Sequence, residues 1–378
     1  MSNNREAEII EAVNKFEELL RTQIERNENI KNQPKENKEF KVIGICDGDG
    51  IGPTITNSAR KVLDVLLQGE DIEIKEIKGF NIENRLEAGE TVPADILAEI
   101  KKCDVLLKGP TTTPSSESST PNLESANVFL RKTLDLYANL RPVIIPEKKI
   151  DWTFFRENTE GEYALGSQGI EIKDSLAFDF KVTTEEGTKR IARLAFEYAK
   201  ANGKKKVSII TKANIMKKTD GKFLKLCKEV GSEYPEISVD SWYVDIMAAN
   251  LINDEINKDF EVLILPNLYG DIITDEAAQL QGGVGTAGSA NIGNGFAMFE
   301  AIHGSAPRMV EEGLTEYANP SSILRAVVMM LRHIGYASKA ILLEHALDGA
   351  SSEGIIVTGL PSGRKCEEIT NYILKNIK

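Results

Sequence analysis

Apolar positions recur along the chain with two different periods, and each period predicts one kind of element. In residues 6–28, apolar side chains return about every 3.6 residues between charged ones, which predicts an amphipathic helix. Residues 29–38 are polar and contain a proline, which predicts a linker. The apolar stripe of the helix needs a cover, either the rest of the chain or a partner subunit. This stripe comprises Ile9, Ile10, Val13, Phe16, Leu20 and Ile24.

From residue 40 onward, short apolar runs alternate with helical patterns. The first run, residues 41–46, leads through a glycine-rich turn into a helical pattern at residues 54–67. The same alternation predicts strands at residues 105–108, 143–145, 206–211 and 261–266, and helices at residues 188–201 and 217–230. Strands that alternate with helices predict an α/β fold with much parallel sheet.

Composition places the chain among ordinary globular proteins. Of its 378 residues, 41% are apolar and 28% are charged, and 46 basic residues against 58 acidic ones give a formal charge of −12. This charge repels phosphate backbones and acidic membrane surfaces, so we expect no nucleic-acid and no membrane partner. No apolar run approaches the roughly 20 residues of a membrane helix, and the N-terminus lacks the features of an export signal.

The four cysteines are scattered and match neither a zinc site nor a disulfide framework. Free cysteines are typical of a reducing compartment, and we therefore expect a cytoplasmic protein.

Two glycine-rich segments are similar to nucleotide-binding loops without matching them. Gly48, Gly50 and Gly52 follow a predicted strand, but Pro53 stands where the third glycine of the dinucleotide fingerprint belongs. Residues 283–288 have the correct glycine spacing, but they follow a helical pattern instead of a strand. Backbone turns with positive φ explain glycine equally well in both segments, so the sequence predicts no Rossmann loop.

Two carboxylates follow the predicted strand at residues 261–266. If a helix begins there, Asp271 and Asp275 share one of its faces. Adjacent carboxylates repel each other unless they share a cation, and such hard oxygen ligands suit Mg²⁺ or Mn²⁺. The alternative is that they complement the positive end of the helix, which explains one aspartate more easily than both.

Three arginines lie near apolar segments, at positions 131, 141 and 156. Because guanidinium groups pair bidentately with carboxylates, Arg131, Arg141 and Arg156 together predict a di- or tricarboxylate ligand that also coordinates the metal. Salt bridges within an acidic protein are the alternative for each of them.

Taken in order, six segments make the chain from about residue 41 to the C-terminus resemble the β-decarboxylating dehydrogenases, which act on isocitrate, isopropylmalate, homoisocitrate or tartrate. The segments are GDGIGP at 48–53, KGPTTTP at 108–114, RENTEGEY at 156–163, KANIMK at 212–217, the Asp271/Asp275 segment, and HGSAP at 303–307 followed by Asn319-Pro320. The resemblance implies a two-domain fold with a non-Rossmann cofactor site. It assigns residues 41–136 and 282–378 to a large cofactor-binding domain, residues 137–281 to a small domain with the dimer interface, and residues 1–40 to an added helix and linker.

The segment before Arg131 narrows the substrate. Ser125, Asn127 and Arg131 resemble the pattern of isocitrate dehydrogenases, in which the serine and asparagine meet the γ-carboxylate. Isopropylmalate enzymes place leucines there, because polar groups facing an alkyl substituent are left unpaired. The resemblance also implies substrate contacts for Arg141 and Arg156. Homoisocitrate is only one methylene longer than isocitrate, and such a difference discriminates weakly.

The resemblance assigns chemical roles to five further residues. It implies that Asp271 and Asp275 bind Mg²⁺ or Mn²⁺ together with Asp245 from a second subunit. Lys212, also across the subunit interface, would work with an aspartate, Asp245, to remove the hydroxyl proton as hydride leaves for the nicotinamide. Tyr163 would then protonate the enol carbon after CO₂ has left. An ordinary aromatic contact is the alternative for Tyr163.

The cofactor residues implied by the resemblance include one departure from the family pattern. Arg308-Met309 replaces both the acidic residue common in NAD enzymes and the Lys-Tyr pair common in NADP enzymes. Glu311 and Glu312 follow, and acids near the ribose disfavour a 2′-phosphate, so we expect NAD, with NADP as the alternative. The implied contacts are Thr112, Thr113, Asn214, His303, Gly304, Ser305, Ala306, Arg308 and Asn319.

These features together predict a homodimeric or larger enzyme that oxidises and decarboxylates isocitrate to 2-oxoglutarate and CO₂. The alternatives are a homoisocitrate, tartrate or isopropylmalate dehydrogenase, or a regulatory chain without turnover. Regulatory chains of the family usually lose a metal aspartate, the tyrosine or the lysine, and all of these are present in this chain.

Overall fold

The computed structural model describes residues 2–32, 40–114, 123–166, 168–172, 176–356 and 363–377. The chain forms two units. Unit 1 comprises Met1–Lys35 and Pro146–Ile273, and unit 2 comprises Glu36–Ile145 and Thr274–Lys378. Helix α9 (Asn267–Leu280) passes from one unit into the other.

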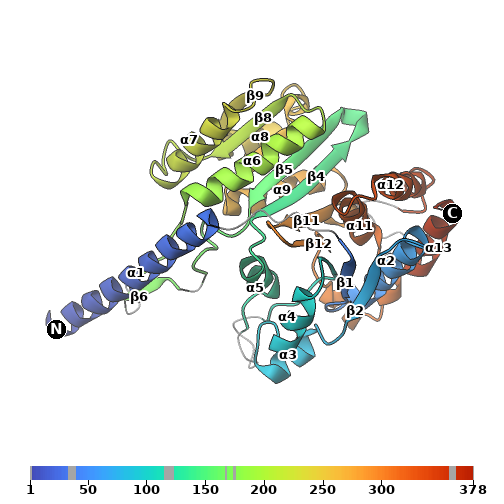
Figure 1. Ribbon diagram of the computed structural model, residues 1–378, viewed down its shortest axis with the longest axis horizontal. Helices are drawn as coiled ribbons and strands as arrows, with labels where there is room; N and C mark the ends of the chain where they lie inside the picture. Colours follow the sequence, from blue (N-terminus) through green and yellow to red (C-terminus); the bar gives the residue numbers. More distant parts are fainter. Residues whose placement is uncertain are drawn as a thin grey trace. The chain divides into compact units, whose positions relative to one another are not determined.

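Unit 1 is organised around four parallel strands in the order β5 (Ile150–Glu157), β10 (Val262–Leu265), β8 (Lys206–Thr211) and β9 (Ser238–Tyr243). The central strand β10 is wholly buried and apolar, and β8 is buried at every residue but its first, as expected for parallel strands that are covered on both faces. Helices α6 (Glu185–Ala201) and α7 (Thr219–Gly231) pack against these strands, and α8 (Val244–Leu251) follows β9 (Figure 1).

The carboxyl ends of these four strands lie at one edge of the sheet, because all four run in the same direction. Arg156 lies at the end of β5, Asn267 follows β10, Lys212 follows β8, and Asp245 follows β9. Neighbouring strands are about 4.8 Å apart, so the fold gathers these polar residues along one edge.

Unit 2 contains a mixed sheet in the order β2 (Glu73–Ile77), β1 (Val42–Cys46), β3 (Val105–Lys108), β12 (Ala297–Ala301), β11 (Gly288–Ile292) and β4 (Ala138–Ile145). The first four strands are parallel, and β11 is antiparallel to both of its neighbours. Alternate side chains of β1, β3 and β12 enter two apolar cores. One core includes α2 (Gly52–Leu66), α11 (Ser321–His333), α12 (Ala337–Ser352) and α13 (Cys366–Asn376), and the other includes α4 (Ala94–Lys101) and α5 (Ala126–Thr133).

The remaining elements are short. They are α3 (Ile82–Ala88), α10 (Pro307–Glu311) and the 3₁₀ turns η1 (Pro146–Lys148), η2 (Asn257–Asp259), η3 (Val284–Thr286) and η4 (Thr315–Tyr317).

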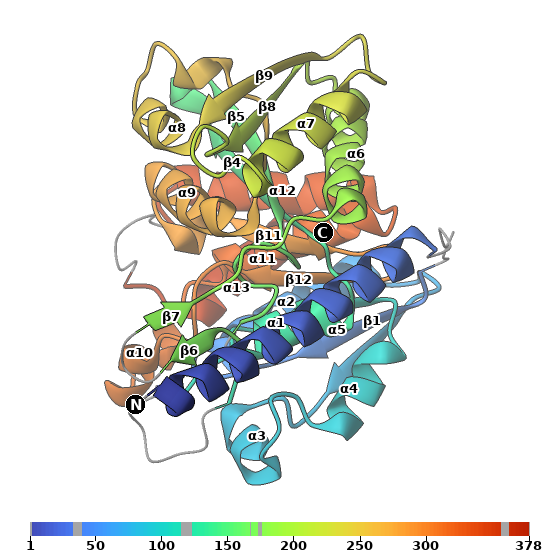
Figure 2. The same ribbon diagram turned by 90° about the vertical axis from the view of Figure 1, so that its left-hand side faces the viewer.

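The N-terminal helix α1 (Ser2–Lys31) docks on unit 1. It contacts α6 and β6 (Ile170–Ile172), which forms an antiparallel pair with β7 (Leu176–Phe178) (Figure 2). Leu19 and Ile30 are buried, and the ring centroids of Phe16 and Phe180 are 5.3 Å apart. The predicted apolar stripe nevertheless remains 45–58% exposed, because the helix turns a different face toward unit 1.

The predicted α/β fold with much parallel sheet is confirmed, with several changes at element boundaries. Helix α1 extends to Lys31, so the linker predicted from residue 29 begins too early, and residues 33–38 lie outside the described residues. The strand predicted at residues 143–145 is the end of the longer β4, in which Asn139 and Arg141 interrupt the apolar run. Helix α9 begins at Asn267, four residues before Asp271, where the prediction placed its start.

Several glycines of the two nucleotide-like segments are explained by close backbone contacts within unit 2. Gly48 and Gly50 have φ values of 70° and 60°. A Cβ atom on Gly50 would lie 2.0 Å from the Ser305 carbonyl oxygen, and one on Gly48 would lie 2.2 Å from that of Pro110. In the second segment, a Cβ atom on Gly288 would lie 2.4 Å from the Ala326 nitrogen. At Gly48, Gly50 and Gly288 a side chain is therefore excluded by the close approach of another chain segment, whereas a Cβ atom on Gly285 would meet no heavy atom within 4 Å.

We predict that Gly50→Ala lowers the free energy of unfolding by roughly 1–3 kcal/mol, because alanine adds both an unfavourable φ and a backbone clash. The measurement is urea denaturation followed by circular dichroism. Gly69→Ala is the matched control, since Gly69 has a φ of 83° but no heavy atom within 4 Å of the added Cβ. Equal losses in the two variants would contradict a role for the Ser305 contact.

Candidate active site

A buried polar network in unit 2 joins two of the three predicted substrate arginines. Arg141 Nε donates to Asn139 Oδ1 at 3.0 Å, and Asn139 Nδ2 donates to Asn291 Oδ1 at 3.0 Å. Asn291 Nδ2 donates to Glu300 Oε1 at 2.8 Å, and Arg131 Nη2 donates to the same oxygen at 3.2 Å. The network fixes both guanidinium groups through side chains of the adjacent strands β4, β11 and β12.

Glu300 is the anionic centre of this network. It is 4% exposed, and Lys108 on the neighbouring strand places Nζ 3.0 Å from its Oε2. Burial opposes ionisation of Glu300, but the positive charges of Lys108 and Arg131 outweigh this effect and hold its pKa at about 2. Glu300 is therefore ionised at neutral pH and holds Arg131 in place.

Arg131 still has an unused donor on the other side of its guanidinium group. Its Nε atom is buried and has no hydrogen-bond acceptor among the residues that the structure describes. Helix α5 also carries Asn127, whose Oδ1 accepts from Thr111 Oγ1 at 3.1 Å, and Ser125 stands at the N-cap position of the helix. One short helix thus presents all three residues of the predicted substrate pattern.

Arg141 also contacts one of the predicted metal ligands. Its Nη1 atom donates to Thr274 Oγ1 at 2.6 Å and to Asp275 Oδ1 at 2.7 Å. The Arg141 side chain is buried, whereas that of Asp275 is 59% exposed. Asp275 therefore keeps part of its carboxylate accessible while Arg141 fixes its orientation.

A second cluster lies in unit 1 around the third arginine, Arg156. Its Nε and Nη2 atoms donate to Asn267 Oδ1 at 3.0 and 2.7 Å, and its Nη1 donates to Asp271 Oδ1. The Tyr163 hydroxyl donates to Asp271 Oδ2 at 2.9 Å. The guanidinium carbon lies 5.3 Å from the centroid of the Tyr163 ring, within cation–π range. Three predicted site residues therefore meet in this cluster, namely Arg156, Tyr163 and Asp271.

Lys212 and Asp245 form a separate pair in unit 1. Lys212 Nζ donates to Asp245 Oδ1 at 2.6 Å, and this hydrogen bond lowers the pKa of Asp245. The backbone N–H of Lys212 donates to Asp220 Oδ2 at 2.6 Å, and the buried Asp220 also pairs with Lys181 at 2.6 Å. Asn214 lies in the exposed turn after Lys212.

Helix α9 carries Asp271 and Asp275 one helical turn apart, as predicted. Their hard oxygen donors fit Mg²⁺ or Mn²⁺. Within the described parts of the chain, no group of three His, Cys, Asp or Glu side chains is placed to hold a metal ion. A hard cation takes about six oxygen ligands, so two carboxylates fit such a site only if further oxygens complete it.

Two loops of unit 2 bring several of the predicted cofactor residues together. The hydroxyls of Thr112 and Ser305 lie 2.8 Å apart, and the Thr112 amide donates to Asp49 Oδ2 at 2.6 Å. Burial lowers the pKa of His303, and its buried Nε2 has no partner in the described part of the chain. A bound ligand would satisfy such an atom, so the loop fits a cofactor.

The other predicted cofactor residues are spread around these loops. Gly304 has open space at its Cα, and Ala306 adopts a left-handed φ of 52° before α10. Arg308 is exposed and pairs with Glu312 at 2.8 Å. Asn319 accepts from the backbone N–H of Ser321 at 2.9 Å, and Thr113 is exposed.

Sequence reasoning missed the residues that hold the arginines. These are Lys108, Asn139, Asn267, Asn291 and Glu300. The available signal was a polar residue inside an otherwise apolar strand, as in the segment AMFEA at 297–301. Such a residue must find a partner when it is buried, although the sequence does not show which one.

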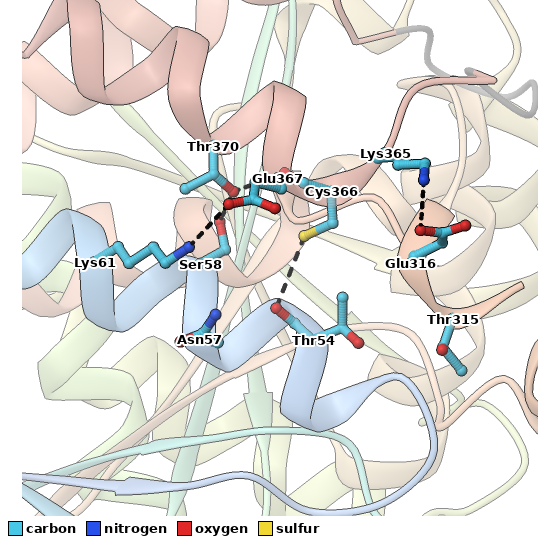
Figure 3. Close-up of a pocket in the computed structure, with 10 residues that line it drawn as sticks. All are labelled: Thr54, Asn57, Ser58, Lys61, Thr315, Glu316, Lys365, Cys366, Glu367 and Thr370. Carbon is cyan, nitrogen blue, oxygen red and sulfur yellow. Dashed lines mark hydrogen bonds and ion pairs between the residues drawn. The ribbon is translucent and has the colours of Figure 1, made fainter.

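A cavity of about 270 Å³ lies elsewhere in unit 2, between α2, η4 and α13 (Figure 3). Its charged lining consists of Lys61, Glu316, Lys365 and Glu367, and Lys365 pairs with Glu316 at 2.8 Å. None of the predicted site residues lines this cavity.

The chain is similar to one family of known proteins in its sequence and in its fold. Residues 42–373 match the family model described as isocitrate/isopropylmalate dehydrogenase. A Dictyostelium discoideum protein, named as a regulatory chain of mitochondrial NAD isocitrate dehydrogenase, is 38% identical over 92% of this chain and 95% of its own length. The alpha chain of the mitochondrial NAD enzyme from Macaca fascicularis is also 38% identical, over 89% of this chain and 95% of that protein. The crystal structure of isocitrate dehydrogenase from Methylococcus capsulatus has a TM-score of 0.79 and 34% identity, and covers 89% of this chain and 99% of that one.

The expectation of a cytoplasmic protein is wrong, because these curated relatives are named as mitochondrial. All four cysteines are free and buried, but free thiols indicate the redox environment and do not identify the compartment. Across the described residues, no helix is long and apolar enough to cross a membrane.

We predict that Glu300→Gln lowers the free energy of unfolding by roughly 3–5 kcal/mol at neutral pH, because it leaves Lys108 and Arg131 without their buried counter-charge. Urea denaturation measures this loss. A depressed pKa stabilises the fold above the unfolded-state value, so the difference between the two proteins should shrink as pH falls from about 5 toward about 3.

Glu367→Gln provides the control, since Glu367 is 72% exposed and 3.6 Å from Lys61. We expect a change below ~0.5 kcal/mol for this variant. A Glu300→Gln protein as stable as the wild type at neutral pH would show that the buried charge is not needed.

Proposed function

Because the chain belongs to the isocitrate/isopropylmalate dehydrogenase family, we propose that it oxidises and decarboxylates isocitrate to 2-oxoglutarate and CO₂, with a divalent metal and NAD. The observation that carries this proposal is the arrangement of α5. Glu300 fixes Arg131 through Nη2, while Arg131 Nε has no acceptor within the described residues. Ser125 and Asn127 lie on the same short helix, and together the three side chains suit a carboxylate.

The polarity of this helix distinguishes between substrates of the family. An isopropyl group would leave the hydroxyl of Ser125 and the amide of Asn127 without partners, at a cost of about 1–3 kcal/mol for each buried group. Arg141 and Arg156 are buried, and each also contacts an aspartate of α9. We assign them to the other carboxylates of isocitrate. Homoisocitrate and tartrate remain alternatives that a direct assay must decide.

Asp271 and Asp275, with Asp245 from a second subunit, would hold Mg²⁺ or Mn²⁺. When bound, the metal supplies a positive charge that favours ionisation of the α-hydroxyl and stabilises the enolate formed on loss of CO₂. Arg141 and Arg156 hold the two α9 carboxylates in position before the ion arrives.

Lys212 and Tyr163 would move the protons of the reaction. Lys212 first passes one ammonium proton to the aspartate that it hydrogen-bonds, Asp245. As hydride leaves C2 for the nicotinamide, the neutral amine of Lys212 accepts the proton of the α-hydroxyl, which yields the β-keto acid. The bond to the β-carboxylate then breaks and CO₂ leaves. Tyr163 delivers its phenolic proton to the resulting enol carbon, which completes 2-oxoglutarate. In the structure this proton is donated to Asp271, so the hydroxyl is already oriented.

We propose a homodimer in which each site takes Lys212 and Asp245 from the second subunit. The support is the surface around this pair, where Ile215, Tyr243 and Ile246 are 44–66% exposed. Clustered exposed apolar side chains are typical of protein interfaces. Residues 137–281, which carry them, would form the dimer-interface domain, and residues 41–136 with 282–378 would bind most of the cofactor.

NAD is the proposed cofactor because Arg308 is already paired with an acid. Its Nε lies 2.8 Å from Glu312 Oε1, so a 2′-phosphate would have to compete with that carboxylate. The proposed contacts are Thr112, Thr113, Asn214, His303, Gly304, Ser305, Ala306, Arg308 and Asn319.

A regulatory role is the second candidate, because the Dictyostelium relative is named as a regulatory chain. In that case the protein would bind ligand without turnover and would need a catalytic partner chain. Tyr163, Lys212, Asp245, Asp271 and Asp275 are all present, which favours the catalytic role.

We predict that the purified chain reduces NAD with isocitrate and Mg²⁺ or Mn²⁺, with a kcat/KM for NAD at least ~10-fold above that for NADP. Absorbance of the reduced nicotinamide measures the rate, and isopropylmalate, homoisocitrate and tartrate are assayed in parallel. Folded, metal-supplied protein without turnover on any of these acids would contradict catalysis and favour the regulatory role.

We predict that Tyr163→Phe and Lys212→Met are each nearly inactive alone but regain activity when they are co-expressed. If the site is shared between subunits, a mixed dimer contains one site with both native residues, and random pairing restores about one quarter of the wild-type rate. If both residues act within one chain, mixing restores nothing, and the shared-site proposal fails.

A further inference from the structure

Helix α1 sends one charged side chain into the interior of unit 1. Arg26 places Nη1 3.0 Å from Glu160 Oε1, and its Nη2 donates to Thr159 Oγ1 at 2.8 Å. The Arg26 side chain is 25% exposed, whereas that of Glu160 is only 3% exposed. The pair is therefore largely withdrawn from water, where a charged hydrogen bond contributes more than it does on the surface.

Glu160 is held firmly on its other side. Its carboxylate accepts hydrogen bonds from the backbone N–H of Thr184 at 2.9 Å and from the Thr184 hydroxyl, at the start of α6. A Cβ atom on Gly187 would lie 2.2 Å from Glu160 Oε1, so the first turn of α6 leaves room only for this carboxylate. Arg26 supplies its positive counter-charge.

The main chain of Glu160 leads directly to the cluster around Arg156. The Glu160 carbonyl accepts from Asn267 Nδ2 at 3.0 Å, and Asn267 Oδ1 accepts both Nε and Nη2 of Arg156. Since the amide of Asn267 is bound at both ends, a shift of the Glu160 carbonyl reorients the acceptor for Arg156. Arg156 and Tyr163 in turn donate to Asp271.

The turn that contains Glu160 also depends on the charge of Arg26. The buried Glu157 carboxylate accepts from the amides of Thr159 at 2.9 Å and Glu160 at 2.6 Å. Burial and the nearby Glu160 raise the pKa of Glu157 to about 7, and Arg26 opposes this rise. Arg190 of α6 also faces the turn, and its Nη2 lies 3.3 Å from Thr159 Oγ1.

We propose that Arg26 is a positioning residue for substrate binding, acting from α1 through Glu160 and Asn267 on the guanidinium group of Arg156. This inference rests on the proposed function, in which Arg156 binds a carboxylate of isocitrate. Arg26 lies outside residues 42–373, so the dependence comes from a segment that the family model does not cover.

The test compares Arg26→Gln and Arg26→Lys with Arg21→Gln. Arg21 lies on the same helix but is 76% exposed and pairs only with Glu17 among described residues. We expect Arg26→Gln to raise the KM for isocitrate about tenfold, with a smaller change in kcat and no change in the KM for NAD. Arg26→Lys keeps the positive charge but loses the two-pronged guanidinium group, so its KM for isocitrate should lie between those of the wild type and Arg26→Gln.

The pH profile distinguishes positioning from a general loss of stability. Without Arg26, the pKa of Glu157 rises further, so its carboxylate becomes protonated at higher pH and releases the amides of the turn. The acid limb of kcat/KM should therefore move upward by ~1 pH unit in Arg26→Gln and stay in place in Arg21→Gln. Wild-type KM and pH profile in folded Arg26→Gln and Arg26→Lys would overturn the proposal.

Hydrogen exchange separates this inference from the proposed function. The amides of Thr159 and Glu160 should exchange faster in Arg26→Gln than in Arg21→Gln, whether or not the protein turns over isocitrate. If the two amides exchange faster in Arg26→Gln but its KM for isocitrate equals that of the wild type, the positioning role alone is overturned. Absence of isocitrate turnover and binding in the wild type, with the exchange difference intact, would overturn the proposed function.

Discussion

The candidate site depends on buried arginines that are fixed by acceptors of their own chain before a ligand binds. Arg131 and Arg141 are held through Glu300, Asn291 and Asn139, and Arg156 is held through Asn267. A buried guanidinium group without such acceptors would be strongly destabilising. The acceptors also limit the rotation of each guanidinium group. Binding of a carboxylate therefore costs little additional side-chain entropy.

The sequence was most informative where a chemical requirement is local. The helix turn that carries Asp271 and Asp275 and the strand before Lys212 follow from residue spacing, whereas the Ser125-Asn127-Arg131 pattern came from the family resemblance. The structure contains the corresponding elements α9, β8 and α5. The partners of these residues come from strands that are distant in the chain, as with Asn139 and Glu300. Periodicity carries no information about which buried polar residues will pair.

Helix α1 illustrates the same limit. Its amphipathic period correctly predicted a helix, but Leu19, Ile30 and Arg26, which dock it, lie outside the predicted stripe. The stripe contributes the partly exposed Phe16 to the contact. A docking face is chosen by the shape and charge of its receptor, here the polar turn at Thr159 and Glu160. The apolar pattern of α1 therefore identified a face that remains largely exposed, and it did not identify the face that docks on unit 1.

The contact between Arg26 and Glu160 joins residues that are synthesised at different times, because they are 134 positions apart in the chain. At about 5–20 residues per second, the ribosome needs on the order of ten seconds to deliver the receptor after the helix has emerged. During that interval Arg26 and Leu19 have no receptor in their own chain, and the apolar stripe of α1 is exposed, as it still is in the folded unit. The nascent chain thus carries an exposed amphipathic helix for on the order of ten seconds before the turn that receives Arg26 exists, and a chaperone or an already folded copy can bind the helix in that time.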